Sequence, residues 1–213
     1  MTLDPEAEGP PVEPAEPVEP VELVAEPLSA EAFAPFGEVI EAEGRAGAGR
    51  PGAGPPQPDG RDGAGAGSTG AYPINDGTAH RRDHVARVDV ALKGGGLRVS
   101  VARAAPRRLP LLVERLERHP LGSQAFVPMT GSRFLVVVAP APPQDAGEGA
   151  LRAAGVRAFV AGRGQGINYR RGIWHHPLTA LDRETDFLVL DRDGLGENLE
   201  EIVLDRPVRV LVS

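Results

Sequence analysis

The sequence predicts a mainly β protein, an antiparallel barrel or jelly roll with a few short helices. Several short apolar segments, rich in Val, Leu and Phe, are bounded by Pro, Gly or Asp, a pattern that is typical of strands. No long segment with a 3.6-residue period alternates with them, which argues against a parallel α/β sheet. The expected strands cover residues 97–103, 124–129, 133–139, 156–161, 186–191 and 207–212.

The first 26 residues predict a disordered tail. Glu-Pro pairs recur every third residue between positions 13 and 20. Proline at this density blocks helix and sheet, and the repelling glutamates favour an extended chain. A single folded domain is therefore expected over residues 27–213, with the tail in front of it.

The domain is expected to begin with a short helix and a strand. Ser29 can cap the helix, Phe33 and Phe36 give it an apolar face, and the strand passes through Val39 and Ile40. Residues 44–70 then contain ten Gly and four Pro, which predicts a flexible loop inserted in the domain. These glycines do not form a phosphate-binding loop, because no GxxxxGK[ST] motif occurs.

Composition excludes several kinds of chemistry. The chain has no Cys, which rules out disulfides, thiolate zinc sites and a cysteine nucleophile. Residues 1–43 carry 12 of the 30 acidic side chains and none of the 23 basic ones, so the rest has a net charge of +5. No basic cluster with interleaved aromatic residues occurs, so nucleic acid is not expected as a partner. No apolar run is long enough to span a membrane, and the first basic residue is Arg45, so we expect a cytoplasmic protein.

Two polar clusters interrupt the apolar pattern. In LERHPLGSQAF (116–126), Glu117 and His119 are two residues apart, which places both on one face of a strand, and Gln124 begins the next strand. The segment GRGQGINYRRGIWHHPL (162–178) holds Tyr169, the only Trp, and His175. Consecutive side chains of a strand point to opposite faces, so His175 and His176 are expected on different sides.

The spacing of these clusters is similar to the two motifs of the cupin barrels. Glu117, His119, Gln124 and Gly131 match HxH(x)4E(x)6G in frame, and Gly164, Gly172 and His175 match G(x)5PxG(x)2H, with Arg170 in place of Pro. Two histidines and a carboxylate can hold a divalent metal, whereas an amide such as that of Gln124 is a poor ligand. Metal binding by Glu117, His119 and His175 is therefore an open alternative, and no cofactor is required by the sequence.

Longer segments resemble one family. RLERHPLGSQAFVPM (115–129), INYRRGIWHHPL (167–178), INDG (74–77), RVSVARAAPRRLP (98–110) and DFLVLDR (186–192) stand in the order and spacing of the ureidoglycolate lyases of allantoin degradation. The resemblance implies a cupin-like barrel, usually a homodimer, that cleaves (S)-ureidoglycolate into glyoxylate and urea. Asp76 and Arg170 depart from the residues expected at their positions.

The resemblance also suggests roles for individual side chains. His119 is the first candidate base, Glu117 orients it or holds its charge, and His175 is the candidate acid; base and acid can be exchanged. Histidine suits both roles because its ordinary pKa of about 6.5 is close to neutral. The candidate substrate-binding residues are Arg103 or Arg118 for the carboxylate, Gln124 and Tyr169 for the ureido group, Asn75 as a cover and Trp174 as a wall.

Two further classes of function remain open at the level of sequence. The first is a non-catalytic cupin that binds a small carboxylate, which would need an arginine but no acid–base pair. The second is another metal-dependent cupin enzyme, such as an isomerase or dioxygenase, although Gln124 stands where that class uses Glu. Analysis of the products released from ureidoglycolate distinguishes these readings.

Overall fold

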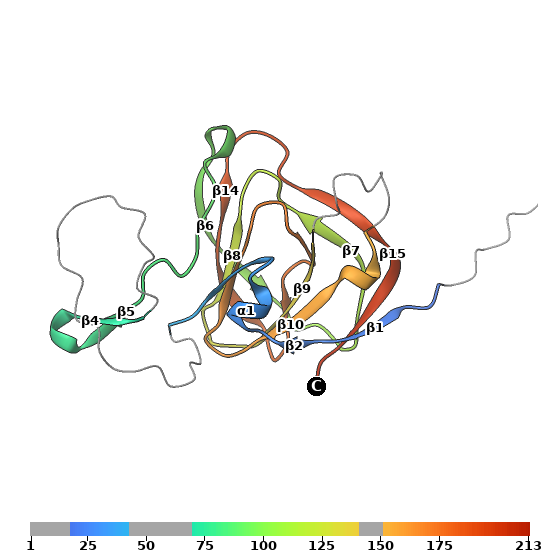
Figure 1. Cartoon of the computed structure of the whole chain (residues 1–213), viewed down its shortest axis with the longest axis horizontal. Coiled ribbons are helices and arrows are strands. Elements are labelled where there is room, and N and C mark those ends of the chain that lie inside the picture. Colours follow the sequence, from blue (N-terminus) through green and yellow to red (C-terminus); the bar gives the residue numbers. More distant parts are fainter. Residues whose placement is uncertain (1–17, 43–69, 141–150) are drawn as a thin grey trace, which may run out of the picture.

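The computed structural model describes residues 18–42, 70–140 and 151–213 (Figure 1). Most of the predicted tail and nearly all of the predicted Gly-rich loop lie outside these residues. The part of the tail that is described, however, contains strand β1 (Val21–Val24), which pairs with the C-terminal strand. The ordered chain therefore begins before Pro27, because the apolar side chains of this segment pack against the core.

Strands are the main regular element of the structure, as the sequence predicts. The helix α1 (Ala30–Phe33) is capped by Ser29, whose hydroxyl accepts a hydrogen bond from the Ala32 amide at 3.2 Å. The remaining strands are β2 (Glu26–Pro27), β3 (Gly37–Ile40), β4 (Tyr72–Ile74), β5 (Ala79–Arg81), β6 (Gly96–Ala104), β7 (Leu111–Arg118), β8 (Gln124–Pro128), β9 (Phe134–Ala139), β10 (Arg157–Ala161), β11 (Gly166–Tyr169), β12 (Trp174–His175), β13 (Thr179–Ala180), β14 (Thr185–Asp193) and β15 (Glu200–Leu211). The short 3-10 helices are η1 (Asn75–Gly77), η2 (Leu92–Gly94) and η3 (Ala153–Gly155).

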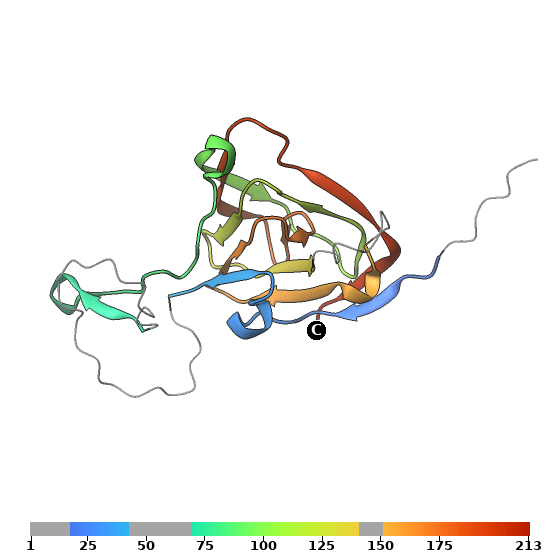
Figure 2. The same cartoon turned by 45° about the horizontal axis from the view of Figure 1, so that its top comes forward.

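The larger sheet curls until its two ends meet. Its strands follow the order β1-β15-β7-β12-β9-β10-β2, with β13 pairing with β9. The end strands β1 and β2 are consecutive pieces of one segment, separated only by Ala25. The Ala25 amide donates to the Leu211 carbonyl at 2.8 Å, and the Leu28 amide donates to the Val160 carbonyl at 2.9 Å. This N-terminal segment thus closes a nearly complete barrel (Figures 1 and 2).

A second sheet packs against one side of this barrel. Its strand order is β3-β11-β8-β14-β6, and every pairing in it is antiparallel. Strand β9 is buried on both faces, which explains its uninterrupted apolar sequence FLVVVA. Its odd-numbered residues join the barrel core inside the large sheet, and its even-numbered residues join the inter-sheet core between the two sheets.

Aromatic side chains dominate the inter-sheet core. Phe33 of α1 contacts Phe159 edge-on, with ring centroids 5.9 Å apart, and Tyr169 at 6.1 Å. Phe36 also lies against Phe159, at 6.3 Å. The short helix therefore contributes to stability through its apolar face, as its sequence predicts.

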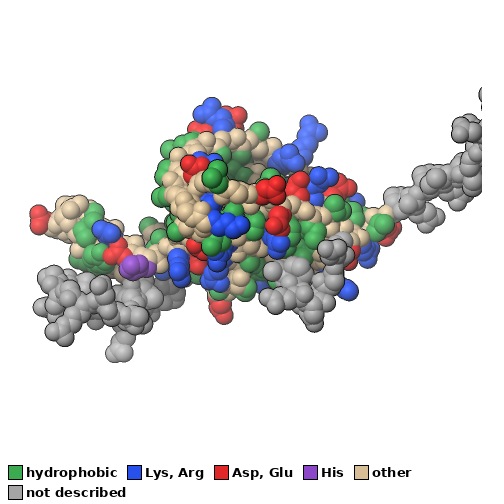
Figure 3. Space-filling model, turned by 90° about the horizontal axis from the view of Figure 1, so that it is seen from above, with side chains coloured by type: hydrophobic (Ala, Val, Ile, Leu, Met, Phe, Trp, Pro, Cys, Tyr) green, Lys and Arg blue, Asp and Glu red, His purple; other side chains and the backbone are tan. Residues whose placement is uncertain are grey.

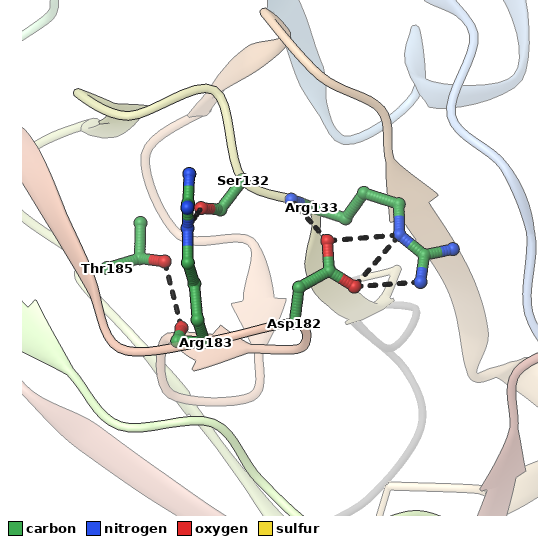
Figure 4. A network of polar contacts seen from close by, with 5 residues as sticks. All are labelled: Ser132, Arg133, Asp182, Arg183 and Thr185. Carbon is green, nitrogen blue, oxygen red and sulfur yellow. Dashed lines mark hydrogen bonds and ion pairs between the residues drawn. The ribbon is translucent and has the colours of Figure 1, made fainter.

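The surface carries pairs of opposite charges. Arg133 donates to both carboxylate oxygens of Asp182, with a shortest contact of 2.8 Å, and Arg183 donates to Ser132 at 3.1 Å (Figure 4). Basic and acidic side chains are interspersed on the face seen in Figure 3. None of the helices in the described ranges is long and apolar enough to cross a membrane.

We expect Phe159→Ala to lower the free energy of unfolding by about 3–5 kcal/mol, because it leaves a cavity in the inter-sheet core. Leu112→Ala on β7 is the control, since Leu112 is 49% exposed and its loss is expected to cost no more than about 0.5 kcal/mol. Urea unfolding followed by circular dichroism measures both. Equal losses in the two variants would contradict this account of the core.

Candidate active site

The candidate site lies where strands of the two sheets face each other. On the large sheet, Glu117 of β7 and His175 of β12 are cross-strand partners, so their side chains share a face. On the second sheet, Gln124 of β8 and Tyr169 of β11 are also cross-strand partners. Both pairs border the inter-sheet core, and His119 follows directly after β7.

The ring of His119 is fixed by two hydrogen bonds. Its Nδ1 lies 2.6 Å from the carbonyl oxygen of Asn198, and a carbonyl only accepts, so Nδ1 carries a proton. Its Nε2 lies 3.2 Å from Oε1 of Gln124. The side chain of Asn198 also accepts a hydrogen bond from the Leu121 amide at 2.8 Å, which holds the segment after β14 over the site.

His175 is held in the same way but is buried more deeply. The residue is 1% exposed, and Nδ1 donates to the Ile173 carbonyl at 2.9 Å. Tyr169 stacks on the ring, with centroids 4.2 Å apart. Nε2 is buried and has no hydrogen-bond partner among the described residues. A buried polar atom in this condition indicates a site that is completed by something else.

Glu117 stands beside both histidines. Its Oε1 lies 3.5 Å from Nε2 of His175, which is long for a hydrogen bond, so the interaction is mainly Coulombic. Burial by itself raises the pKa of this carboxyl, but the close His175 ring, with smaller contributions from the neighbouring His119 and His176, outweighs burial. The pKa of Glu117 therefore lies below its usual value, and the group is ionised at neutral pH.

These three side chains fit a divalent cation. Ligand atoms of Glu117, His119 and His175 all lie within 4.8 Å of one another. Backbone carbonyls hold both Nδ1 protons, so the lone pair of each neutral ring is on Nε2; that of His175 has no other partner among the described residues, whereas that of His119 faces Gln124. The buried Nε2 of His175 lacks another partner in the described part of the chain, which fits the same role.

A pocket of about 290 Å³ opens beside His119. Its size suits a small metabolite, since pockets for drug-sized ligands begin at roughly 300 Å³. Glu117 and His175 do not belong to its lining, so His119 is the residue of the cluster that borders the pocket. The lining residues are Arg98, His119, Ser123, Gln124, Asp191, Arg192, Asp193, Gly194, Asn198 and Leu199.

The structure places both candidate arginines away from this pocket. Arg103 makes a bidentate pair with Asp186, at 2.7 and 3.0 Å, and is 66% exposed on the outer face of β6. Arg118 donates to Glu200 at 2.7 Å and covers the ring of Trp174. Neither residue belongs to the pocket lining.

Two other candidates also lie elsewhere. Trp174 points into the barrel core, on the face opposite to His175, as the alternation of a strand requires. Asn75 lies in η1 at the tip of the β4–β5 hairpin, apart from the barrel (Figures 1 and 2). His176 is turned from the cluster and donates to the Pro177 carbonyl at 2.9 Å.

Several pocket residues were not found by sequence reasoning. Asn198 acts through its backbone carbonyl, which leaves no trace in the residue type. Arg98 and Asp191 oppose each other on β6 and β14, and both occur in segments that carry the family resemblance. Side chains alternate between the two faces of a strand, and counting from the core residues of β6 and β14 would have placed Arg98 and Asp191 on their faces.

Comparison with known proteins finds a family model and several relatives that match most of this chain. A family model described as Ureidoglycolate lyase matches residues 20–211. A Burkholderia mallei protein named ureidoglycolate lyase is 46% identical over 179 residues, covering 84% of this chain and 87% of that protein. Proteins of the same name from Chelativorans and Pseudomonas fluorescens are 41% and 39% identical, covering 88% and 90% of this chain and 95% and 96% of their own lengths. Among solved structures, RmlC from Streptococcus suis in complex with dTDP-D-xylose is 17% identical, with a TM-score of 0.32, over 47% of this chain and 45% of that one.

We expect the protein to bind one Zn²⁺ per chain, and His175→Ala or Glu117→Gln to weaken this binding at least about tenfold, since each removes a ligand. Because imidazole ligands must be deprotonated, metal binding competes with protons and the affinity should fall as the pH is lowered. Isothermal titration calorimetry measures both effects. His80→Ala, at an exposed position on β5, is the matched control. Unchanged affinity in both site variants would remove the metal from this cluster.

Proposed function

Since the chain belongs to the ureidoglycolate lyase family, we propose that it cleaves ureidoglycolate into glyoxylate and urea at the Glu117–His119–His175 cluster. One observation carries the choice of site. Two histidines with fixed Nδ1 protons and an ionised carboxylate converge beside a pocket of metabolite size. Such a cluster can take a proton at one atom of a substrate and deliver a proton at another.

The reaction needs two proton transfers and no water. One carbon of ureidoglycolate carries a hydroxyl, a carboxylate and the urea nitrogen. A base removes the hydroxyl proton while the carbon–oxygen double bond forms, and the carbon–nitrogen bond breaks. An acid protonates the departing nitrogen, which gives urea. Each positioned transfer contributes roughly 10²–10⁴ in rate.

We assign the base role to His119. Its ring borders the pocket, so Nε2 can approach a bound substrate. Nδ1 donates its proton to the Asn198 carbonyl oxygen, with 2.6 Å between nitrogen and oxygen. In the neutral ring the lone pair is therefore on Nε2. The side-chain amide of Gln124 lies 3.2 Å from Nε2. By flipping, this amide can donate an N–H to the lone pair of the neutral ring or accept the N–H of the protonated ring with its oxygen.

His175 takes the role of the acid. Its Nε2 lies 3.5 Å from the carboxylate of Glu117, so a proton on Nε2 has an acceptor beside it. Glu117 is the more accessible partner, with 21% of its side chain exposed against 2% for His175. The carboxylate can therefore pass the proton of His175 towards the pocket.

The remaining site residues orient the substrate or the catalytic histidines. Gln124 lines the pocket and can hydrogen-bond the ureido group. Burial raises the pKa of the Tyr169 phenol, so this group stays protonated and packs flat against His175. A divalent cation held by Glu117, His119 and His175 would occupy the same Nε2 lone pairs, so it would replace these acid and base roles and would instead polarise the hydroxyl and carboxylate oxygens of the substrate.

A homodimer formed through β6 is part of the same proposal. Among the described strands β6 pairs only with β14, so one of its edges has no partner within that part of the chain. Leu97, Val99 and Val101 of β6 are 53%, 60% and 60% exposed on the outer face, which is unusual for apolar residues of a strand. The β4–β5 hairpin projects on the same side of the molecule (Figures 1 and 2). A second copy related by a two-fold axis would cover this face. The expected cytoplasmic location stays a prediction that cell fractionation would test.

Product analysis tests the proposed reaction. Purified protein is incubated with racemic ureidoglycolate, with and without a chelator, beside a protein-free control that corrects for spontaneous decay. We expect equal amounts of glyoxylate and urea above the control and no ammonia. Ammonia as a major product would mean a different reaction, and no product would leave a carboxylate-binding protein as the better account.

In the same assay, His119→Ala is expected to lower kcat at least about a hundredfold, because it removes the proposed base. His80→Ala, which changes an exposed histidine of β5, should keep the wild-type rate. Thermal unfolding of both variants checks that they remain folded. A near-wild-type rate for folded His119→Ala would refute the assignment.

For the dimer, the expected mass in solution is twice that of the 22.4 kDa chain. Val99→Glu should give monomers, because it buries a charge in the proposed interface. Val203→Glu on β15, at a position that is also 60% exposed, should leave the dimer intact. Light scattering after size-exclusion chromatography measures all three masses. A dimeric Val99→Glu variant would move the interface elsewhere.

A further inference from the structure

The pocket beside His119 contains an arginine whose position suits the carboxylate of the substrate. Arg98 of β6 is the cross-strand partner of Asp191 of β14. Arg98 and Ala102 are four residues apart on β6, so their side chains leave the same face of the strand. Ala102 packs on the inter-sheet core, and the side chain of Arg98 therefore starts on the inner face of the sheet. It is 52% exposed, and both Arg98 and Asp191 line the pocket.

Asp191 holds the guanidinium through one edge only. Nε of Arg98 donates to Oδ1 at 2.9 Å, and Nη2 donates to Oδ2 at 2.8 Å. A guanidinium has five N–H donors, so this bidentate contact leaves the edge formed by Nη1 and the second proton of Nη2. The pair thus fixes the orientation of Arg98 while three of its donors stay available for an anion.

The other arginine of the pocket is already engaged. Arg192 is 3% exposed and donates to the backbone carbonyls of Leu92 and Leu195 at 3.0–3.1 Å. Gly95 and Gly122 make room for it, because a Cβ at either position would lie 2.4 or 2.7 Å from its side chain. Arg192 therefore ties loops together, and its buried guanidinium is held by the backbone.

The charges of the pocket also balance before a substrate enters. Arg98 and Arg192 are matched by Asp191 and Asp193, so the lining offers no general excess of positive charge. Recognition of a carboxylate must then come from directed donors, as in a bidentate contact. Arg98 is the cation of the lining that has such donors available.

We propose that the free edge of Arg98 binds the carboxylate of the substrate, with Asp191 as a positioning residue that holds the guanidinium. This inference rests on the proposed function. It places the carboxylate at the mouth of the pocket and directs the hydroxyl and ureido groups towards His119 and Gln124. A small 2-hydroxy or 2-oxo carboxylate is the class of ligand that fits this arrangement.

Kinetics of Arg98→Gln and Arg98→Lys test the proposal. Arg98→Gln should raise KM for ureidoglycolate and the inhibition constant of glyoxylate by about 10- to 100-fold, because it removes charged hydrogen bonds. Inhibition by urea, which has no carboxylate, should not change. Arg98→Lys should restore part of the loss, because it keeps the charge but not the fork. Arg133→Gln, which breaks a bidentate pair with Asp182 outside the pocket, is the matched control and should leave all these constants unchanged.

The outcomes separate this inference from the proposed function. If the wild-type protein releases glyoxylate and urea but Arg98→Gln has an unchanged KM and glyoxylate inhibition, the arginine contact alone is refuted. If the wild type shows no turnover, the proposed function fails, and calorimetry with glyoxylate still tests the contact. Weaker binding of glyoxylate by Arg98→Gln than by Arg133→Gln would support the contact between Arg98 and the carboxylate. Equal binding by the two variants would overturn it.

Discussion

The burial of β9 on both faces is the constraint on which the rest of the structure depends. The side chains on one face of β9 pack in the barrel core, and those on the other face pack in the inter-sheet core. The same strand therefore contributes to both cores. Strand β12 is only two residues long and pairs with both β9 and β7. Alternation along β12 then sends Trp174 into the barrel and His175 towards the second sheet. The candidate site thus lies at the edge of a rigid core, which limits its motion.

Backbone carbonyls, more than side chains, determine what the two histidines can do. The carbonyls of Asn198 and Ile173 each accept a proton from Nδ1. Both rings are therefore fixed in orientation and tautomer, with Nε2 of His175 3.5 Å from Glu117 and Nε2 of His119 3.2 Å from Gln124. Because the two carbonyls belong to different segments, one after β14 and one before β12, the site forms only when the whole domain is folded.

Sequence reasoning finds the parts of this molecule whose signals are local. The apolar runs between turns predict the strands, the Ser29 cap predicts α1, and the frame of Glu117, His119 and His175 predicts their convergence. It does not find β1, because a Glu- and Pro-rich segment has no strand pattern of its own and is ordered by pairing with β15. It names Arg103 and Arg118 but not Arg98, although alternation along β6 places Arg98 on the same face as Ala102 and Arg103 on the opposite face.

The cluster is costly in the folded protein, and that cost is informative. Nε2 of His175 is buried and has no partner in the described ranges, and such an atom costs about 1–3 kcal/mol. Glu117 is partly desolvated beside it, with its nearest oxygen 3.5 Å away, beyond hydrogen-bond length. A protein selected only for stability would replace such a group with a packed apolar side chain. The arrangement is reasonable where a proton, a cation or a substrate completes it, which is the condition that an acid–base site requires.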